Sequence, residues 1–241
     1  MKSLVLFLLC LFLTTPVWAG ASRSFDGTDD EITAGDVLNV TTGNVSVCAW
    51  WNGTEDASAD AILGRIESDA ANDNGYLLRQ DTTDVNSFKV GDGTAGIAST
   101  ATTDTDAAWF WVCGTWDGAG NTTIIYVNGI QEDTDTATVG SLTATAALQF
   151  GETNNDGGDA AGLISYGGVT LNVLTIVEVN ESMWKPELFV ITPSSPSLWP
   201  LWGSNSPEID LGSADRGGTI VAGTAASASG PPVMFGDGLP L

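Results

Sequence analysis

The chain has 241 residues, which is long enough for one sandwich domain or two small ones. Hydrophobic residues make up 43% of it, enough for a packed core. Asp and Glu number 30 against 7 Lys and Arg, which gives a net charge of −23. This negative charge excludes nucleic acid and an anionic membrane surface as partners, because both would repel it. Histidine is absent, which excludes His-based triads, His general bases and the usual zinc sites.

Residues 1–21 have the pattern of a secretory signal peptide. Lys2 supplies the positive start, residues 4–13 form an unbroken apolar run, and Ala19 and Ala21 offer small residues for cleavage. The apolar run is too short to span a bilayer of roughly 30 Å comfortably, so cleavage is favoured over a membrane anchor. The sequence therefore predicts a protein that is secreted or exposed at the cell surface, with no membrane attachment after cleavage.

Short runs of β-forming residues, separated by Gly-, Asp- and Asn-rich turns, extend to residue 179. No apolar period of 3.6 residues persists over ten residues, and at most 181–188 forms a helical turn. This pattern predicts an all-β, antiparallel two-sheet sandwich. The strands are expected at 45–51, 61–66, 76–79, 87–90, 97–102, 109–114, 124–127, 142–150, 163–166 and 169–179.

The stretch from 109 to 131 is the most informative part of the chain. Its first run is apolar on both faces, as in a strand at the centre of a sandwich. Its second run, 124–127, ends at Asn128 and Gly129, a strong hairpin signal. We therefore expect this stretch to form a central strand and a hairpin.

The composition changes after residue 192, where Pro, Ser and Gly become frequent. A flexible linker is one interpretation. A packed tail is favoured, because Leu198, Trp199 and Leu201 are too apolar to leave in water. We expect a sandwich over residues 22–192 and an extension over 193–241, which docks one or two strands on the sandwich, one of them at 217–221.

Six motifs occur in a fixed order between residues 24 and 179: SFDGTDDEI, VSVCAWW, ILGR, NGYLL, WVCGTWDGAGNTTIIYVNG and LQFGE. In this order they resemble laminin-G-like domains of the concanavalin A-like lectin and glucanase superfamily. The resemblance implies a jelly roll of two antiparallel sheets with one concave face. The tail resembles a segment that often precedes SFDGTDD in such proteins, so we expect it to dock beside the N-terminal strand, as in a circular permutation.

Two strands resemble the pentraxin branch, in which one cysteine on each strand forms a disulfide. Cys48 and Cys113 occupy those positions. Independently, an exported chain with two mature cysteines, each in a strand beside Trp, is expected to oxidise them. The alternative is a pair of buried free thiols.

The pentraxin resemblance also implies calcium, held by an Asp-Asn pair in one loop and by acidic and amide residues in a later loop. Their oxygen atoms suit calcium, but Thr153 and Asn154 depart from the pentraxin pattern, and Asn, Asp and Gly are also ordinary turn residues. Both interpretations stay open. The candidate ligands are Asp73, Asn74, Glu152, Asn154, Asn155 and Asp156.

Three further acids, Asp26, Asp29 and Asp30, could hold a separate structural ion, although turn chemistry is favoured there. Most tryptophans are expected in the core, because strand alternation buries them. Trp116, beside the turn at Asp117, is the candidate exposed aromatic for a ligand.

Catalysis is not expected. Retaining glycosidases need two carboxylates roughly 5 Å apart, and the Glu-x-Asp-x-Glu pattern begins at Glu208 and Asp210 but ends with Gly212. The sequence thus predicts a secreted, non-catalytic module that binds carbohydrate or glycoprotein, with possible help from calcium. The alternatives are a structural or adhesive surface or virion protein making protein contacts, and a degenerate glycoside hydrolase.

Overall fold

The structure is a computed structural model. It describes residues 21–40, 43–54, 59–67, 73–105, 107–153, 158–186, 197–201, 208–212, 216–220, 223–227 and 229–231. The predicted signal peptide lies outside the described residues except for Ala21. No helix in these ranges is long and apolar enough to span a membrane.

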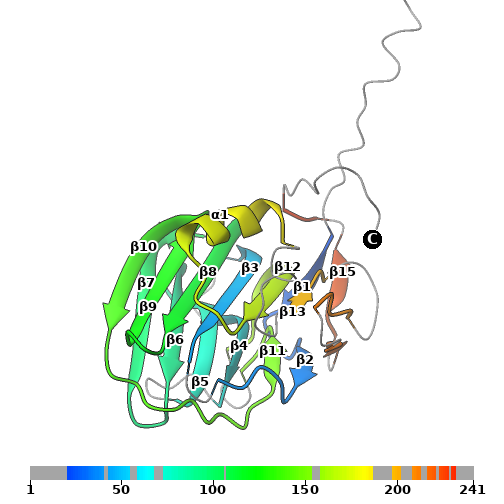
Figure 1. Cartoon of the computed structure of the whole chain (residues 1–241). Coiled ribbons are helices and arrows are strands. Elements are labelled where there is room, and N and C mark those ends of the chain that lie inside the picture. Colours follow the sequence, from blue (N-terminus) through cyan, green and yellow to red (C-terminus); the bar gives the residue numbers. More distant parts are fainter. Residues whose placement is uncertain are drawn as a thin grey trace, which may run out of the picture.

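The described strands form two antiparallel sheets, which confirms the predicted all-β sandwich (Figure 1). The first, sheet A, has eight strands. Along its hydrogen-bonded path they are β10 (Ile130–Thr136), β9 (Thr122–Val127), β8 (Phe110–Asp117), β3 (Val45–Gly53), β12 (Ala161–Thr170), β1 (Ser22–Asp26) and β15 (Ala225–Ser227), with β13 (Ser197–Trp199) also paired to β12.

The second, sheet B, has seven strands among the described residues. Their order is β14 (Thr219–Ile220), β2 (Ile32–Gly35), β11 (Leu148–Phe150), β4 (Asp60–Ile66), β5 (Gly75–Gln80), β6 (Val85–Gly91) and β7 (Gly96–Asp104). The pairing of β2 with β11 places Gln149 opposite Thr33 and brings its side chain to Glu31, 118 residues earlier in the sequence. This register decides which loop acids meet at the ends of these strands.

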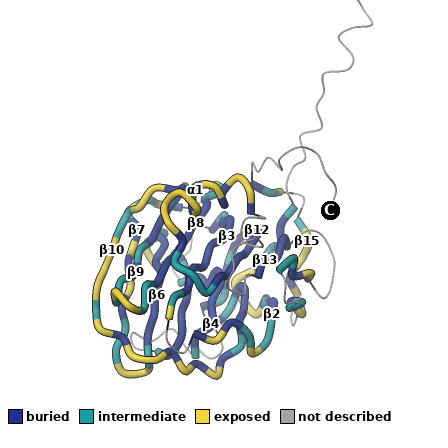
Figure 2. Tube along the Cα trace, in the orientation of Figure 1, coloured by how far each residue is buried: buried dark blue, intermediate teal, exposed yellow. Residues whose placement is uncertain are grey.

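The main hydrophobic core lies between the two sheets, and Figure 2 shows the buried trace through the centre of the molecule. Trp51, from sheet A, is fully buried, and its Nε1 donates to Gln80 Oε1 of sheet B at 2.6 Å. Gly114 faces the ring of Phe88 so closely that a Cβ atom would lie 2.0 Å from Phe88 Cγ. Large rings therefore fill the core only because small residues face them.

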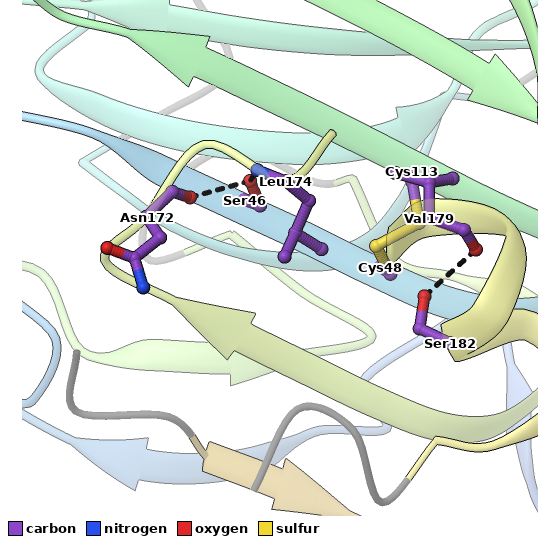
Figure 3. The surroundings of a disulfide bond; sticks show 7 residues. All are labelled: Ser46, Cys48, Cys113, Asn172, Leu174, Val179 and Ser182. Carbon is purple, nitrogen blue, oxygen red and sulfur yellow. Dashed lines mark hydrogen bonds between the residues drawn. A yellow bond between two sulfur atoms is a disulfide. The ribbon is translucent and has the colours of Figure 1, made fainter. Parts of the chain in front are cut away.

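The stretch from 109 to 131 forms the centre of sheet A, as predicted. β8 lies between β3 and β9, and a tight turn at Asn128 and Gly129 joins β9 to β10. Cys48 and Cys113 are register partners on β3 and β8, and they form a disulfide (Figure 3). The interpretation as free thiols was therefore wrong.

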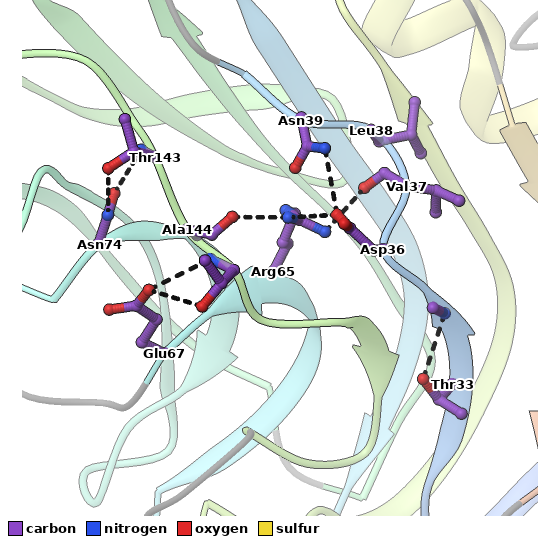
Figure 4. A network of polar contacts seen from close by, with 12 residues as sticks. Thr33, Asp36, Val37, Leu38, Asn39, Arg65, Glu67, Asn74, Thr143 and Ala144 are labelled. Atoms are coloured by element: carbon purple, nitrogen blue, oxygen red, sulfur yellow. Dashed lines mark hydrogen bonds and ion pairs between the residues drawn. The ribbon is translucent and has the colours of Figure 1, made fainter.

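Two predicted strands were partly wrong. The run 142–150 gives only β11 at its end, because its earlier residues bond to side chains: Thr143 N–H donates to Asn74 Oδ1, and the carbonyl of Ala144 accepts from Arg65 (Figure 4). The alternation nevertheless predicted burial correctly, since the side chains that it marks are buried: Leu142, Ala144, Ala146 and Leu148.

The run 169–179 is not one strand. β12 ends at Thr170, and a helix, α1 (Ile176–Trp184), follows. A capping box starts α1, in which Thr175 Oγ1 accepts from the Glu178 N–H and the Glu178 carboxylate accepts from the Thr175 N–H at 2.7 Å. The predicted helical turn at 181–188 therefore began five residues too late.

The residues after 196 contribute strands to both sheets in the described part of the tail. β15 pairs with β1, β14 pairs with β2, and β13 pairs with β12. A buried ion pair adds to this docking, in which Arg23 of β1 binds Glu208. Trp199 of β13 packs edge-on against Phe150 of sheet B, with ring centroids 5.4 Å apart. The tail thus lies beside the N-terminal strand and fills one end of the core.

Candidate functional site

The predicted calcium ligands fall into different surroundings. The side-chain amide of Asn74 is bonded on both sides to Thr143: Oδ1 accepts from the backbone N–H at 2.8 Å, and Nδ2 donates to Oγ1 at 2.8 Å (Figure 4). Asp73 beside it is half-buried. This arrangement holds the segment after β10 against β5, which is a structural task for Asn74.

Glu152 lies among other acids instead. The pKa of the Glu152 carboxyl is raised to about 7. Burial is the largest cause, and the neighbouring carboxyl groups of Glu31, Asp159 and Asp29 add to it. Neither Asp73 nor Asn74 is among the groups that act on it. The remaining predicted ligands, Asn154, Asn155 and Asp156, lie outside the described residues.

The predicted aromatic platform was wrong. Trp116 is only 2% exposed, because its place in β8 directs the ring into the core between the sheets. Asp117 accepts a hydrogen bond from the N–H of Ala119 at 3.0 Å, which is ordinary turn chemistry. Trp116 is therefore not an exposed aromatic, and the role of the half-buried Asp117 in ligand binding stays a prediction.

The acids of the incomplete glycosidase pattern have structural partners. Glu208 is buried against Arg23 Nε at 2.5 Å. Burial raises the pKa of Glu208, and the Arg23 guanidinium partly offsets that rise. Asp210 accepts from the backbone N–H groups of Leu198, Gly212 and Arg216 and from the hydroxyl of Ser197. These bonds give both acids structural partners and hold the tail together.

An exposed aromatic does occur, on α1. The inner face of the helix is apolar, and Val179 and Met183 pack on the outer face of sheet A over the disulfide (Figure 3). Asn180 fixes the other side of the helix, since its Nδ2 donates to the carbonyl of Gly129 in the β9–β10 turn at 3.2 Å. The helix is thereby held at both faces.

The outward face of α1 lines an open hollow of about 440 Å³. Its size lies within the range of roughly 300–1,000 Å³ that is common for small-molecule sites. Trp184 is 47% exposed and Val177 is 61% exposed at this surface. The described residues that line it are Val177, Asn180, Glu181, Trp184 and Lys185.

The polar groups at this hollow complement the indole ring. Asn180 offers its amide oxygen, since its Nδ2 already donates to the carbonyls of Gly129 and Ile176, while Glu181 offers a carboxylate and Lys185 an ammonium group. Among the described residues, Lys185 is the one cation whose side chain is exposed. An apolar ring face with donors and acceptors beside it can bind a ligand that has both a CH face and hydroxyl groups.

The sequence contains two signs of this helical surface, but its β-branched residues favoured a strand instead. Val177, Glu181 and Trp184 lie at positions i, i+4 and i+7, which share one face only if the segment is helical. The capping-box pattern at Thr175 and Glu178 marks the helix start. The β-branched residues around it favoured a strand and concealed the shared face.

These features define a class, the lectin-like β-sandwich with a helix packed on one sheet. The sequence profile of the concanavalin A-like lectin/glucanases superfamily matches residues 26–170. The chain belongs to this superfamily, which confirms the resemblance seen in the sequence. No curated protein sequence matches the chain.

Solved structures share the fold at low identity. A candidate carbohydrate-binding protein from Bacteroides ovatus has a TM-score of 0.68 at 15% identity; the match covers 91% of this chain and 62% of that protein, so this chain spans less than two thirds of its length. A heptameric SAP-like pentraxin from Limulus polyphemus has a TM-score of 0.53 at 15% identity, over 68% of this chain and 82% of the pentraxin.

A third similar structure is the CBM40 domain of a Ruminococcus gnavus IT-sialidase, bound to α2,3-sialyllactose. Its TM-score is 0.50 at 12% identity, over 64% of this chain and 96% of that domain. At these identities the similarity shows the fold alone. Two of these three structures, the Bacteroides ovatus protein and the CBM40 domain, are described by carbohydrate binding.

Proposed function

We propose that this protein is an exported, non-catalytic carbohydrate-binding module, and that its ligand binds in the hollow on α1. The observation that carries the proposal is the exposed Trp184 indole with Asn180, Glu181 and Lys185 beside it. The lectin-like fold and the carbohydrate ligands named for its structural neighbours support it. The pairing of Glu208 and Asp210 with structural partners supports the absence of hydrolysis.

The sugar ring in this proposal stacks its CH face on Trp184, and its hydroxyl groups bond to Asn180 and Glu181. The ligand we propose is a neutral glycan. The net charge of −23 repels an anionic sugar, and the hollow itself is lined by one acid, Glu181, as well as one cation, Lys185.

A glycan array tests this proposal, followed by titration calorimetry with the best neutral hit. We expect Trp184→Ala to weaken binding about tenfold or more, as is common for a central aromatic contact. Because Trp184 is half exposed, its loss leaves the fold intact, and circular dichroism checks this. Ile209→Ala, on the exposed face of the tail at 54% exposure, is the matched control.

Binding that survives Trp184→Ala unchanged would move the ligand elsewhere. Preference for sialylated over neutral glycans would contradict the neutral ligand and leave the site itself in place. Hydrolysis of any β-glucan on the panel would overturn the non-catalytic reading.

One observation favours a second function, adhesion through protein contacts. Four of the large exposed apolar side chains among the described residues gather at α1 and the turn beside it: Ile130, Ile176, Val177 and Trp184. A protein partner would depend on all four, whereas a sugar depends on Trp184 and its polar neighbours. Ile130→Ser, with glycan binding unchanged and a partner lost, would favour adhesion.

A further inference from the structure

The last strands of the two sheets meet on the side of the molecule away from the tail. Among the described strands, β10 ends sheet A and β7 ends sheet B, whereas β15 and β14 of the tail stand at the opposite ends. β10 and β7 lie side by side (Figure 1). Because they belong to different sheets, side chains rather than a backbone ladder join them.

Two acids of β10 cap the outer edge of β7. Glu132 Oε2 accepts from the N–H of Thr102 at 2.7 Å and from the N–H of Thr103 at 2.9 Å, and the Thr103 hydroxyl donates to Glu132 Oε1. Asp133 Oδ2 accepts from the N–H of Thr100 at 2.9 Å. An edge strand offers such N–H groups to another chain, and here carboxylates occupy them.

β7 has the composition of a strand that pairs readily. Residues 96–103 read GIASTATT, with no charged side chain and no proline. Ile97 and Ala101 are buried in the core, while Thr100 and Thr102 are exposed. Natural edge strands usually carry a charge or a proline of their own as protection. In this protein the protecting acids come from the neighbouring strand, β10.

The cap weakens with acid. Burial acts to raise the pKa of Glu132, but the hydrogen bonds from Thr103 and Thr102 outweigh it and hold this pKa below its ordinary value of 4.5. The cap is therefore complete above pH 4.5 and is lost as the pH falls through the folded-state pKa.

No opposite charge holds Glu132 in its ionised form. The strands β7, β9 and β10 contain no Lys or Arg. Their other titratable residues are Asp104 at the end of β7, Tyr126 of β9, and Asp133 and Asp135 of β10. The causes that shift the Glu132 pKa include none of these groups. The threonine hydrogen bonds alone therefore oppose its protonation.

We propose that the outer edge of β7 is a docking strand for a second copy of this chain, covered by Glu132 and Asp133 until they are protonated. Two β7 strands related by a two-fold axis pair antiparallel and join two B sheets into one. A second copy fits because its β7 offers the same uncharged, Thr-rich edge. The acids of β10 and the net charge of −23 keep copies apart at neutral pH.

The proposal does not depend on glycan binding, and its test contains no sugar. Amide hydrogen exchange on the dilute full chain at pH 7 examines the cap itself. Glu132→Ala removes the acceptor for the N–H groups of Thr102 and Thr103, so both amides are expected to exchange at least tenfold faster. Unchanged exchange at these two amides would overturn the cap and with it the proposal.

Asp135→Ala is the matched control. It removes the same charge from the same strand, but Asp135 is exposed and accepts from the N–H of its own neighbour, Thr136. The exchange of Thr102 and Thr103 is expected to stay at its wild-type rate in this variant. Faster exchange there would mean that any lost charge loosens β7, which contradicts the specific cap.

Sedimentation velocity over a concentration series measures the docking, in about 1 M NaCl so that repulsion is screened within roughly 3 Å. The wild type should be monomeric at pH 7 and dimeric at pH 3.5. The double variant Glu132→Ala/Asp133→Ala should dimerise at pH 7, with an association constant at least tenfold above that of the wild type. A double variant that stays monomeric, with its β7 amides exposed, would overturn the docking.

A proline on β7 distinguishes strand pairing from general association. Thr102→Pro removes an N–H that faces β10, so it breaks no bond within sheet B. Added to the double variant, it should return the protein to a monomer, and near-UV circular dichroism checks the fold. Should it fail to fold, Thr100→Pro blocks the same edge. A dimer that persists with the proline would place the interface elsewhere and overturn the proposal.

Discussion

At the scale of single residues, this acidic chain buries two of its few cations in ion pairs with carboxylates. Arg23 and Arg65 are both 2% exposed, and each pairs with a carboxylate, Glu208 and Asp36. Arg65 also donates to the carbonyl groups of Val37 and Ala144 (Figure 4). Positive charge therefore fixes loops and the tail in place, while the surface keeps its negative charge.

Glu208→Gln should destabilise the protein by about 3–5 kcal/mol, because it leaves the buried Arg23 guanidinium without its anion. Urea unfolding at pH 7 measures this loss. The double variant Arg23→Met/Glu208→Leu should recover most of it, since removing both charges removes the unpaired one. A loss below 1 kcal/mol in the single variant would contradict the importance of this pair.

At the scale of elements, side chains rather than strands hold the segment after β10. Asp92, in the β6–β7 turn, accepts from Thr94 and Ala95 on one oxygen and from the N–H of Gly140 on the other at 2.6 Å. The N–H bond from Ala95 is the largest cause that lowers the Asp92 pKa to about 2. One carboxylate thus joins a turn to a segment 48 residues later.

This pKa gives a pH dependence with a definite sign. Because the folded-state pKa lies below the ordinary value of 3.8, the Asp92 contribution is present above pH 3.8 and disappears as the pH falls towards 2. Asp92→Ala should therefore be less stable than the wild type at pH 6, and the difference should shrink below pH 3.8. Denaturant unfolding across this range measures it, and a difference that stays constant to pH 2 would refute the assignment.

The elements also show where sequence patterns succeed and fail. Alternation identified the central strand because β8 is apolar on both faces, whereas the pairing of Cys48 with Cys113 was expected from the pentraxin resemblance and from the oxidation of an exported chain. It failed at α1, because the β-branched residues of 169–179 favour strands locally and the packing of Val179 and Met183 on sheet A decides otherwise. It also mistook Trp116 for a surface residue, because the next sheet, which covers it, is not visible in a local pattern.

The candidate sites illustrate the same limit. The Trp184 surface required a correct helix, and the contact of Gln149 with Glu31 required the register of β2 against β11. Pairings across more than a hundred residues leave no periodic trace in either segment. Sequence reasoning found Glu152 only through the family resemblance, and it had no means of finding its partners.

At the scale of the whole molecule, the tail completes the sandwich. Trp199 is fully buried on β13, its Nε1 donates to the Arg216 carbonyl at 2.7 Å, and its ring meets Phe150 across the core. Trp199→Ala should cost about 3–5 kcal/mol, as is typical for a large buried ring. Leu211→Ala, at a half-buried position of the same tail, is the milder control. A loss under 1 kcal/mol, measured by urea unfolding, would mean that the tail docks without stabilising the core.

The position of β1 has a consequence for how the protein is made. β1 pairs on one side with β12 and on the other with β15. The partner of Arg23 in its ion pair, Glu208, lies 185 residues later in the chain. Synthesis runs from the N-terminus at about 5–20 residues per second, so β1 emerges early and has neither neighbour for many seconds. The pairing of β1 with β15 and the ion pair of Arg23 with Glu208 can therefore form only at the end of synthesis, so one edge of β1 stays unpaired until almost the whole chain has been made.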